Sequence, residues 1–222
     1  TSVNLAHYYS SCCGQDVFRN IFEAYENFLH QNRLIDFDDM LVYCKELLVQ
    51  RPDILAAWQK KYQYILIDEF QDINQIQYDI IRMLAAPQDN LFIVGDDDQS
   101  IYRFRGARPE IMLNFTKDYP DAGKVILDTN YRSGAEIVRH AGNLISFNQK
   151  RFEKKITPAA KTGIPVVKQE FQTQREQNLY VIQEILRLHR EGMDYKDMAV
   201  LFRTNMQPRF LMEMMLDYSI SF

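Results

Sequence analysis

Two short apolar runs, each followed at once by acidic residues, constrain this chain more than any other feature. Residues 64–67 run directly into Asp68 and Glu69, and residues 91–94 run into Gly95 and three consecutive aspartates. Apolar runs of that length indicate strands buried on both faces, as in parallel sheets. Side chains at the carboxyl ends of such strands lie where open α/β sheets bind ligands. Paired acids there suit nucleotide chemistry, in which one holds a magnesium ion and the other orients water.

Helical periodicity separates these runs and predicts an α/β fold with a parallel sheet. Apolar residues recur every three or four positions, and Asp36 stands where it can cap a helix. Strands that alternate with helices favour a parallel sheet. The predicted helices cover residues 17–30, 37–48, 52–58, 73–84, 109–115, 134–148, 175–189 and 208–216. The predicted strands cover residues 64–67, 91–94, 124–127, 166–171 and 198–202.

Composition is that of an ordinary globular protein. The 222 residues suit one or two domains, with 46% hydrophobic and 25% charged residues. The net charge of −4 gives no basic footprint, so a nucleic-acid partner is not predicted from bulk charge, although a local groove can still bind DNA. No apolar run approaches the ~18 residues of a membrane span, and no signal peptide is recognisable. The spacing of Cys12, Cys13 and Cys44 favours buried free thiols in a reducing cytoplasm over zinc or disulfides.

Several short motifs stand in a fixed order along the chain. They are IDFDDML at 35–41, DEFQD at 68–72, GDDDQSIY at 95–102, NYRS at 130–133 and VLFRTN at 200–205. The last four resemble motifs II, III, IV and IVa of the UvrD/Rep family of superfamily 1 DNA helicases, and the first resembles the segment before motif II. The resemblance runs nearly from end to end. It implies ATP-driven movement along single-stranded DNA and duplex unwinding, as in DNA repair.

The resemblance also implies a fold and a set of partners. The fold is α/β, with incomplete RecA-like lobes of the P-loop NTPase type and flanking helices. Residues 1–123 would form the C-terminal part of the first lobe, with a preceding helical segment and motifs II and III. Residues 124–222 would form the N-terminal part of the second lobe, with motifs IV and IVa. The implied cofactors are ATP and Mg²⁺, the implied partner is single-stranded or duplex-junction DNA, and the implied location is the cytoplasm.

A phosphate-cradling loop, G-x-x-x-x-G-K-[ST], is missing from the sequence. The single Gly-Lys pair, Gly123 and Lys124, is followed by Val125, and Asp118 stands where the leading glycine belongs. In the resembled family that loop lies well before motif II, and motifs V and VI, with an arginine finger, lie after the region that ends here. We therefore expect an internal fragment of a longer helicase, which alone hydrolyses ATP poorly or not at all.

In the resemblance the acids of motif II carry the chemistry. Asp68 would hold Mg²⁺, and Glu69 would act as general base toward the attacking water; the alternative is a polar strand end without catalysis. Gln71 and Asp72 are expected to support these acids, and Asp72 is equally suited to cap the helix that follows.

Gln99 of motif III fits a sensor of the γ-phosphate, because its amide can donate to a phosphate oxygen and accept from water. The alternative is a hydrogen bond that anchors the loop. The three aspartates at 96–98 resemble a metal site, but turn chemistry explains some of them and none is assigned as a ligand. Asp96 is expected to help order the site.

The end of motif III resembles a DNA-facing surface. Tyr102 and Phe104 would stack on unpaired bases, worth about 1–3 kcal/mol each, and Arg105 would reach a phosphate. The family commonly has Trp where Phe104 stands, so stacking there is expected to be weaker. The alternative is that both rings pack between the lobes.

Motif IV resembles the part of the second lobe that touches the nucleotide. Tyr131 would stack on adenine, and Arg132 would approach the γ-phosphate, where a guanidinium suits the charge that builds in the transition state. Asn130 is expected to shape the turn.

Motif IVa, with Arg203, Thr204 and Asn205, resembles contacts to the DNA backbone, and a polar loop is the alternative. The basic segment with Lys150, Arg151, Lys154 and Lys155, within the loop-like stretch 149–165, is predicted to be a solvated loop, and contact with phosphates is the alternative. A non-catalytic scaffold remains the alternative for the whole chain. Five residues distinguish the helicase hypothesis from the scaffold hypothesis, because a scaffold has no physical need for all five. They are Asp68, Glu69, Gln99, Tyr131 and Arg132.

Overall fold

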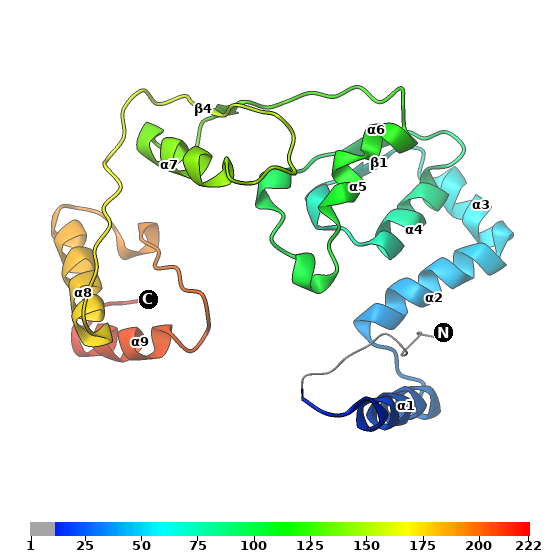
Figure 1. The fold of residues 1–222 in the computed structure, drawn as a ribbon, viewed down its shortest axis with the longest axis horizontal. Helices are drawn as coiled ribbons and strands as arrows, with labels where there is room; N and C mark the ends of the chain where they lie inside the picture. Colours follow the sequence, from blue (N-terminus) through cyan, green and yellow to red (C-terminus); the bar gives the residue numbers. More distant parts are fainter. Residues whose placement is uncertain (1–11) are drawn as a thin grey trace. The chain divides into compact units, whose positions relative to one another are not determined.

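The computed structural model describes residues 12–222, which divide into two compact units (Figure 1). Of the described residues, the first unit holds 12–133 and 138–159, and the second holds 134–137 and 160–222. The first eleven residues of the predicted 1–123 lobe lie outside the described part. The lobe boundary near residue 123 stays a prediction.

Three helices open the described chain close to their predicted positions: α1 (Gln15–Asn32), α2 (Phe37–Gln50) and α3 (Pro52–Lys61). Asp36 caps α2 as predicted, since its side chain accepts from the Asp39 backbone and the Asp39 side chain accepts in return. This reciprocal capping box satisfies two amides that a helix start leaves without partners. Proline at the first position of α3 suits a residue whose missing N–H is not needed there.

The predicted parallel pairing is confirmed for the two acid-tipped strands. β1 (Ile65–Ile67) and β2 (Leu91–Ile93) pair in parallel, with Ile65 opposite Leu91, and α4 (Gln75–Ala85) connects them. The core below them is centred on Phe70, which is fully buried and meets Tyr78 and Phe115 edge to face. Such aromatic pairs add roughly 0.5–1.5 kcal/mol beyond the area they bury.

The helix that follows β1 starts later than the sequence suggested. Residues Phe70–Asp72 form a short 3-10 turn, η2, and Asn74 caps α4 by accepting from the Gln77 backbone. The alternative role of Asp72 as the helix cap is therefore wrong, because the 3-10 turn ends at Asp72 and the helix starts three residues later, with Asn74 in the capping position.

Further along the first unit, the single helix predicted over 109–115 is two short ones. These are α5 (Pro109–Leu113) and α6 (Phe115–Asp118), and Asn114 separates them. Asp97–Gln99 and Arg103–Arg105 form 3-10 turns, η3 and η4, that carry motif III.

The strand predicted over 124–127 is not formed. Strand pairing begins two residues after Leu127, where β3 (Thr129–Asn130) lies parallel to β4 (Thr157–Pro158). Helix α7 (Ala135–Ile145) follows β3 in the sequence. The Val125 side chain is 85% exposed. A strand needs a neighbour to accept its hydrogen bonds, and among residues 12–222 no strand pairs with this stretch.

The second unit is built on two helices, α8 (Gln174–Arg190) and α9 (Pro208–Asp217), joined through the turn η5 (Tyr195–Asp197). Its core consists of the buried side chains Ile182, Ile185, Leu211 and Ile220. The strands predicted over 166–171 and 198–202 are absent from this unit, and the described residues offer neither stretch a strand to pair with.

The cysteine prediction is wrong about burial. Cys12 and Cys44 are exposed. Cys44 lies outside the core because fewer residues of α2 are buried than the helical spacing of its apolar residues predicts. Leu48 is the one apolar residue of α2 that is buried. Within residues 12–222, no helix combines the length and the apolar character needed to cross a membrane.

Candidate functional site

The acidic tip of β1 is held in a strained backbone. Asp68 Oδ1 accepts from the Glu69 backbone N–H at 2.9 Å, and Glu69 itself has φ of 51°, in the left-handed region. A non-glycine residue there costs about 1–3 kcal/mol and persists only where its surroundings hold it. The buried Phe70 ring and the bond from the Phe70 N–H to the Val94 carbonyl, 2.9 Å, hold it here. The strain therefore falls on the predicted general base.

Gln71 joins the loops that follow β1 and β2. Its side chain is buried, with a residue exposure of 1%. Its Nε2 donates to Glu69 Oε2 at 2.6 Å, and its Oε1 accepts from the Asp96 N–H at 2.9 Å. Gly95 leaves the room for this, because a Cβ there would lie 2.5 Å from Gln71 Oε1. Sequence reasoning assigned Gln71 only a general supporting role; Gly95 at the end of the strand was the signal of a close approach of the two loops.

Carboxylate oxygen atoms of Asp68 and Asp72 are available to bind Mg²⁺ at this site. Asp68 is exposed, and only its Oδ1 takes part in a recorded hydrogen bond. Asp72 Oδ1 is buried and lacks a hydrogen-bond partner within the described chain. Mg²⁺ prefers one or two carboxylates and completes its shell with water and phosphate oxygens. The described residues hold no cluster of three or more His, Cys, Asp or Glu that could bind a metal by itself.

The three aspartates of motif III are bound by cations from far along the chain. Arg151 donates two hydrogen bonds to Asp98, from Nε to Oδ1 at 2.7 Å and from Nη2 to Oδ2 at 2.5 Å. Lys154 donates to Asp96 Oδ1 at 2.6 Å and also to Asp97 Oδ1. We call these five residues the acidic clasp. The predicted solvated loop is therefore wrong for Arg151 and Lys154, since paired charges draw them out of water.

The charges of the clasp reinforce one another. Partial burial acts to raise the pKa of the Asp96 carboxyl, but hydrogen bonds from Lys154 and Gln99 outweigh it and leave that pKa below its usual value. Burial acts to lower the pKa of Lys154, and the bonds to Asp96 and Asp97 outweigh it and raise that pKa. Both groups are therefore ionised across the neutral range.

Gln99 stands at the edge of this clasp. Its side chain is exposed, and Nε2 donates to Asp96 Oδ2 at 2.9 Å, while its backbone N–H donates to the Asp96 carbonyl. The loop-anchoring bond weighed for Gln99 is thus present. It fixes where the amide points, and the role as phosphate sensor stays a prediction.

The end of motif III forms an exposed cluster of two rings and a guanidinium. The ring centroids of Tyr102 and Phe104 lie 6.0 Å apart. The Arg105 guanidinium carbon lies 5.1 Å from the first centroid and 5.5 Å from the second, within cation–π range. Both rings are exposed, so their faces are available to a partner.

Motif IV is an exposed turn shaped by Asn130. Its Oδ1 accepts from the backbone N–H groups of Arg132, at 3.0 Å, and Ser133, at 2.8 Å. The turn-shaping role predicted for Asn130 is confirmed. The Tyr131 residue is 84% exposed, and Arg132 is exposed too.

Motif IVa is a polar loop ahead of α9. The backbone N–H groups of Arg203 and Thr204 both donate to Gln207 Oε1, at 2.8 and 3.1 Å. The side chains of Arg203, Thr204 and Asn205 are exposed, and their contact with DNA stays a prediction.

Parallel strands joined by a helix, with acids after the first strand and a polar loop after the second, are the arrangement in which open α/β sheets bind ligands at the carboxyl ends of their strands. The family model of the UvrD/REP helicase N-terminal domain matches residues 4–120, and that of the UvrD-like helicase C-terminal domain matches residues 125–222. The chain belongs to the UvrD/REP helicase family. Its fold is the predicted α/β one, consistent with incomplete RecA-like architecture.

Curated relatives are named as helicases. A putative ATP-dependent DNA helicase, YjcD of Bacillus subtilis, is 42% identical over 209 residues, which cover 94% of this chain and 27% of that protein. The ATP-dependent DNA helicase PcrA of Staphylococcus aureus is 40% identical over 193 residues, covering 87% of this chain and 26% of that protein. PcrA of Staphylococcus epidermidis is 38% identical over 202 residues, 91% of this chain and 28% of that protein. The chain thus spans about a quarter of the length of these relatives.

Proposed function

We propose that this chain is the central part of an ATP-dependent DNA helicase, with motifs II and III in residues 1–123 and motifs IV and IVa in residues 124–222. The observation that carries the proposal is the hydrogen-bond path Glu69–Gln71–Asp96, which couples the acidic tip of β1 to the loop after β2. A polar strand end without catalysis has no need of a buried amide that holds a strained carboxylate in place. The names of the relatives supply the substrate class, ATP and DNA.

In this proposal each group around the nucleotide has a physical task. Mg²⁺, bound by Asp68, would neutralise phosphate charge. Glu69 accepts the proton of the attacking water, and its bond from Gln71 fixes the carboxylate that does so. Gln99 positions water against the γ-phosphate. Tyr131 offers its exposed face to adenine, and Arg132 offers positive charge where the transition state gains negative charge.

DNA contact is assigned to the exposed polar and aromatic groups of two motifs. The cluster of Tyr102, Phe104 and Arg105 is suited to stack on bases of an unpaired strand and to bind its backbone without sequence preference. The side chains at the start of α9, Arg203, Thr204 and Asn205, would bind phosphates. We propose single-stranded and duplex-junction DNA as the partner and the cytoplasm as the location, with a role in DNA repair.

The test is the ATPase rate of the intact helicase that carries this segment. We expect Glu69→Gln to lower kcat by about 10²–10⁴-fold, the usual contribution of a positioned general base. Glu153→Gln, at an exposed glutamate, is the matched control and is expected to leave kcat unchanged. An ATPase rate that ignores Glu69→Gln would overturn the assignment.

The isolated 222-residue chain gives a second test. We expect it to hydrolyse ATP poorly or not at all, because its sequence holds no phosphate-cradling loop. Steady-state turnover by the purified chain, abolished by Glu69→Gln, would contradict that expectation.

A further inference from the structure

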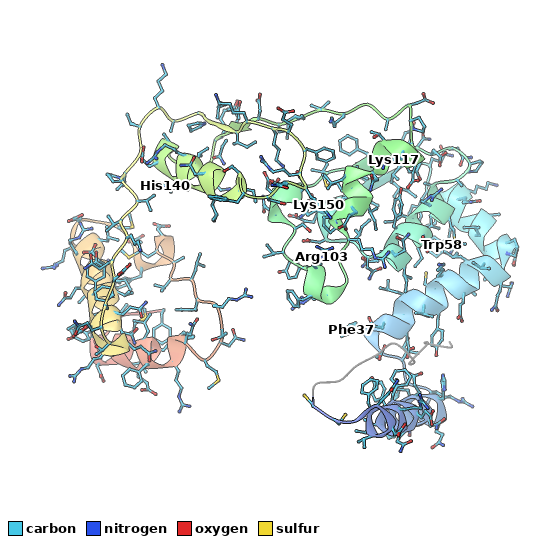
Figure 2. The ribbon with its side chains drawn as sticks, in the orientation of Figure 1. Phe37, Trp58, Arg103, Lys117, His140 and Lys150 are labelled. Carbon is cyan, nitrogen blue, oxygen red and sulfur yellow. The ribbon has the colours of Figure 1, made fainter. Side chains whose placement is uncertain are left out.

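The acidic clasp links residues that stand more than fifty positions apart. Arg151 and Lys154 follow α7 and reach Asp96, Asp97 and Asp98 in the loop after β2 (Figure 2, where Lys150 marks the start of this basic stretch). The backbone joins in, because the Phe152 N–H donates to Asp97 Oδ2 at 2.7 Å. Side chain and main chain of the basic stretch are thus both fastened to motif III.

Burial sets this clasp apart from a surface ion pair. The side chain of Lys154 is 11% exposed, and that of Asp97 is 1% exposed. Exposed pairs contribute little because water screens them, whereas removal of one partner from a buried pair leaves the other charge unmatched. The position of Lys154 is therefore fixed by Asp96 and Asp97, whose carboxylates also accept from Gln99 and from the Phe152 N–H.

The Asp96 carboxylate is shared between Lys154 and Gln99. Its Oδ1 accepts from Lys154 at 2.6 Å and from the Asp98 N–H at 3.1 Å, and its Oδ2 accepts from Gln99 Nε2 at 2.9 Å. A carboxylate is planar and rigid, so a cation that holds one oxygen also sets the direction of the other. Lys154 thereby sets the orientation of the Gln99 amide without touching it.

We propose that Lys154 is a positioning residue of the ATPase site, which acts through Asp96 on the Gln99 amide. This rests on the proposed function, in which Gln99 faces the γ-phosphate. Loss of the ammonium removes the shorter of the two hydrogen bonds to Asp96 Oδ1 and leaves the longer one from the Asp98 N–H, so the carboxylate rotates and carries the amide with it. Lys154 lies in the stretch matched by the C-terminal domain model and Asp96 in the stretch matched by the N-terminal one. The clasp therefore ties the sensor loop of one family domain to the sequence of the other.

The kinetic test compares three variants of the intact helicase. We expect Lys154→Met to lower kcat for ATP about tenfold, a modest cost for a displaced catalytic amide, with KM for ATP changed less than about twofold. Lys154→Arg keeps the charge and is expected to recover most of kcat. Lys155→Met, one position on and exposed, is expected to match the unaltered enzyme. Equal kcat for Lys154→Met and Lys155→Met would overturn the proposal, as would a loss that Lys154→Arg does not relieve.

A spectroscopic test uses the 222-residue chain and does not depend on ATP turnover. The side-chain amide resonances of Gln99, assigned by their loss in Gln99→Ala, are expected to shift in Lys154→Met and to stay in place in Lys155→Met. Far-UV circular dichroism shows whether each variant is folded. If Lys154→Met does not fold, Lys154→Gln, which removes the charge and keeps a polar side chain at this largely buried position, takes its place with the same expected shift. Resonances that stay in place in the folded variant overturn the proposal.

The two tests separate this inference from the proposed function. An intact helicase without ATPase activity would refute the proposed function, and the Gln99 resonances would still decide whether Lys154 positions the amide. Shifted resonances with an unchanged kcat would show that Lys154 orients the amide without affecting ATP hydrolysis. That result would refute the role of Lys154 in the ATPase site and leave the helicase assignment standing.

Discussion

Two stretches of this chain have the same apolar pattern and different structures. Residues Ile65–Ile67 pair with Leu91–Ile93 and lie against the fully buried Phe70. Residues 125–127, Val-Ile-Leu, are as apolar, yet no strand among the described residues pairs with them, and Val125 is exposed. An apolar run becomes a strand only where a second strand accepts its hydrogen bonds and a core receives its side chains. The apolar pattern indicates a possible strand, and the neighbouring segments determine whether the strand forms.

The polar motifs differ in the same way. The acids of motifs II and III bond to one another through Gln71 and to cations through the acidic clasp. The turn of motif IV is shaped by bonds to the Asn130 side chain, and Tyr131 is exposed. The first region should therefore respond strongly to substitution, and the second should respond in binding but little in stability.

The largest expected effect lies at the centre of the paired region. Phe70→Ala removes the ring that Tyr78 and Phe115 contact edge to face, and it should lower the free energy of unfolding by about 3–5 kcal/mol. Denaturant unfolding followed by circular dichroism measures this. Phe147→Ala, at an exposed phenylalanine, should change that free energy by less than about 0.5 kcal/mol. Equal effects of the two substitutions would erase the contrast between the regions.

A smaller effect on the free energy of unfolding is expected at Gly95, where the loop after β2 approaches the loop after β1. Gly95→Ala places a methyl group 2.5 Å from Gln71 Oε1, so the loops must separate, at a cost of about 1–3 kcal/mol. Gly142→Ala is the matched control, because nothing lies within 4 Å of the added Cβ. Within α7 it should stabilise by about 0.5–1 kcal/mol. Thermal or denaturant unfolding shows the sign of each, and stabilisation by Gly95→Ala would refute the close approach.

The acidic clasp should show a pH dependence of known sign. The pKa of Asp96 in the folded protein lies below its usual 3.8, so its ionised form stabilises the fold above that pH. The contribution is lost as pH falls through the lowered value. The raised pKa of Lys154, above its usual 10.5, keeps its own contribution until the pH rises beyond that range.

The measurement is the difference in unfolding free energy between the unaltered chain and Asp96→Asn. It should be roughly 0.5–1 kcal/mol at neutral pH, since the carboxylate is partly exposed and screened, and it should shrink below pH 3.8. Asp121→Asn, at an exposed aspartate, serves as the control. A difference that grows on acidification would have the wrong sign for a depressed carboxyl pKa.

The smallest effect on stability is expected at motif IV. Tyr131→Ala should alter the unfolding free energy by less than about 0.5 kcal/mol, because the ring buries little surface. Tyr78→Ala, at a buried tyrosine whose hydroxyl donates to Asp118 at 2.6 Å, should cost several-fold more. In the intact helicase Tyr131→Ala should raise the KM for ATP. A large loss of stability without a change in KM would show that Tyr131 is a structural residue.

The sequence alone determined the α/β class, the family, the position of most helices and the acids at the end of β1. These follow from local patterns, such as periodicity, capping residues and motifs of adjacent residues. The start of α4 was missed because Asp72 and Asn74 are both good capping residues, and only the 3-10 turn after Glu69 selects between them.

Only the tertiary structure decided which polar groups meet. Gln71 reaches Asp96 across 25 positions, and Arg151 reaches Asp98 across 53. Contacts at such separations leave no periodic trace in a single sequence, since they depend on where strands and loops cross. The same reason explains the unpaired stretch at 124–127: its residues favour a strand, but a strand exists only with a partner, and partnership is a property of the folded chain.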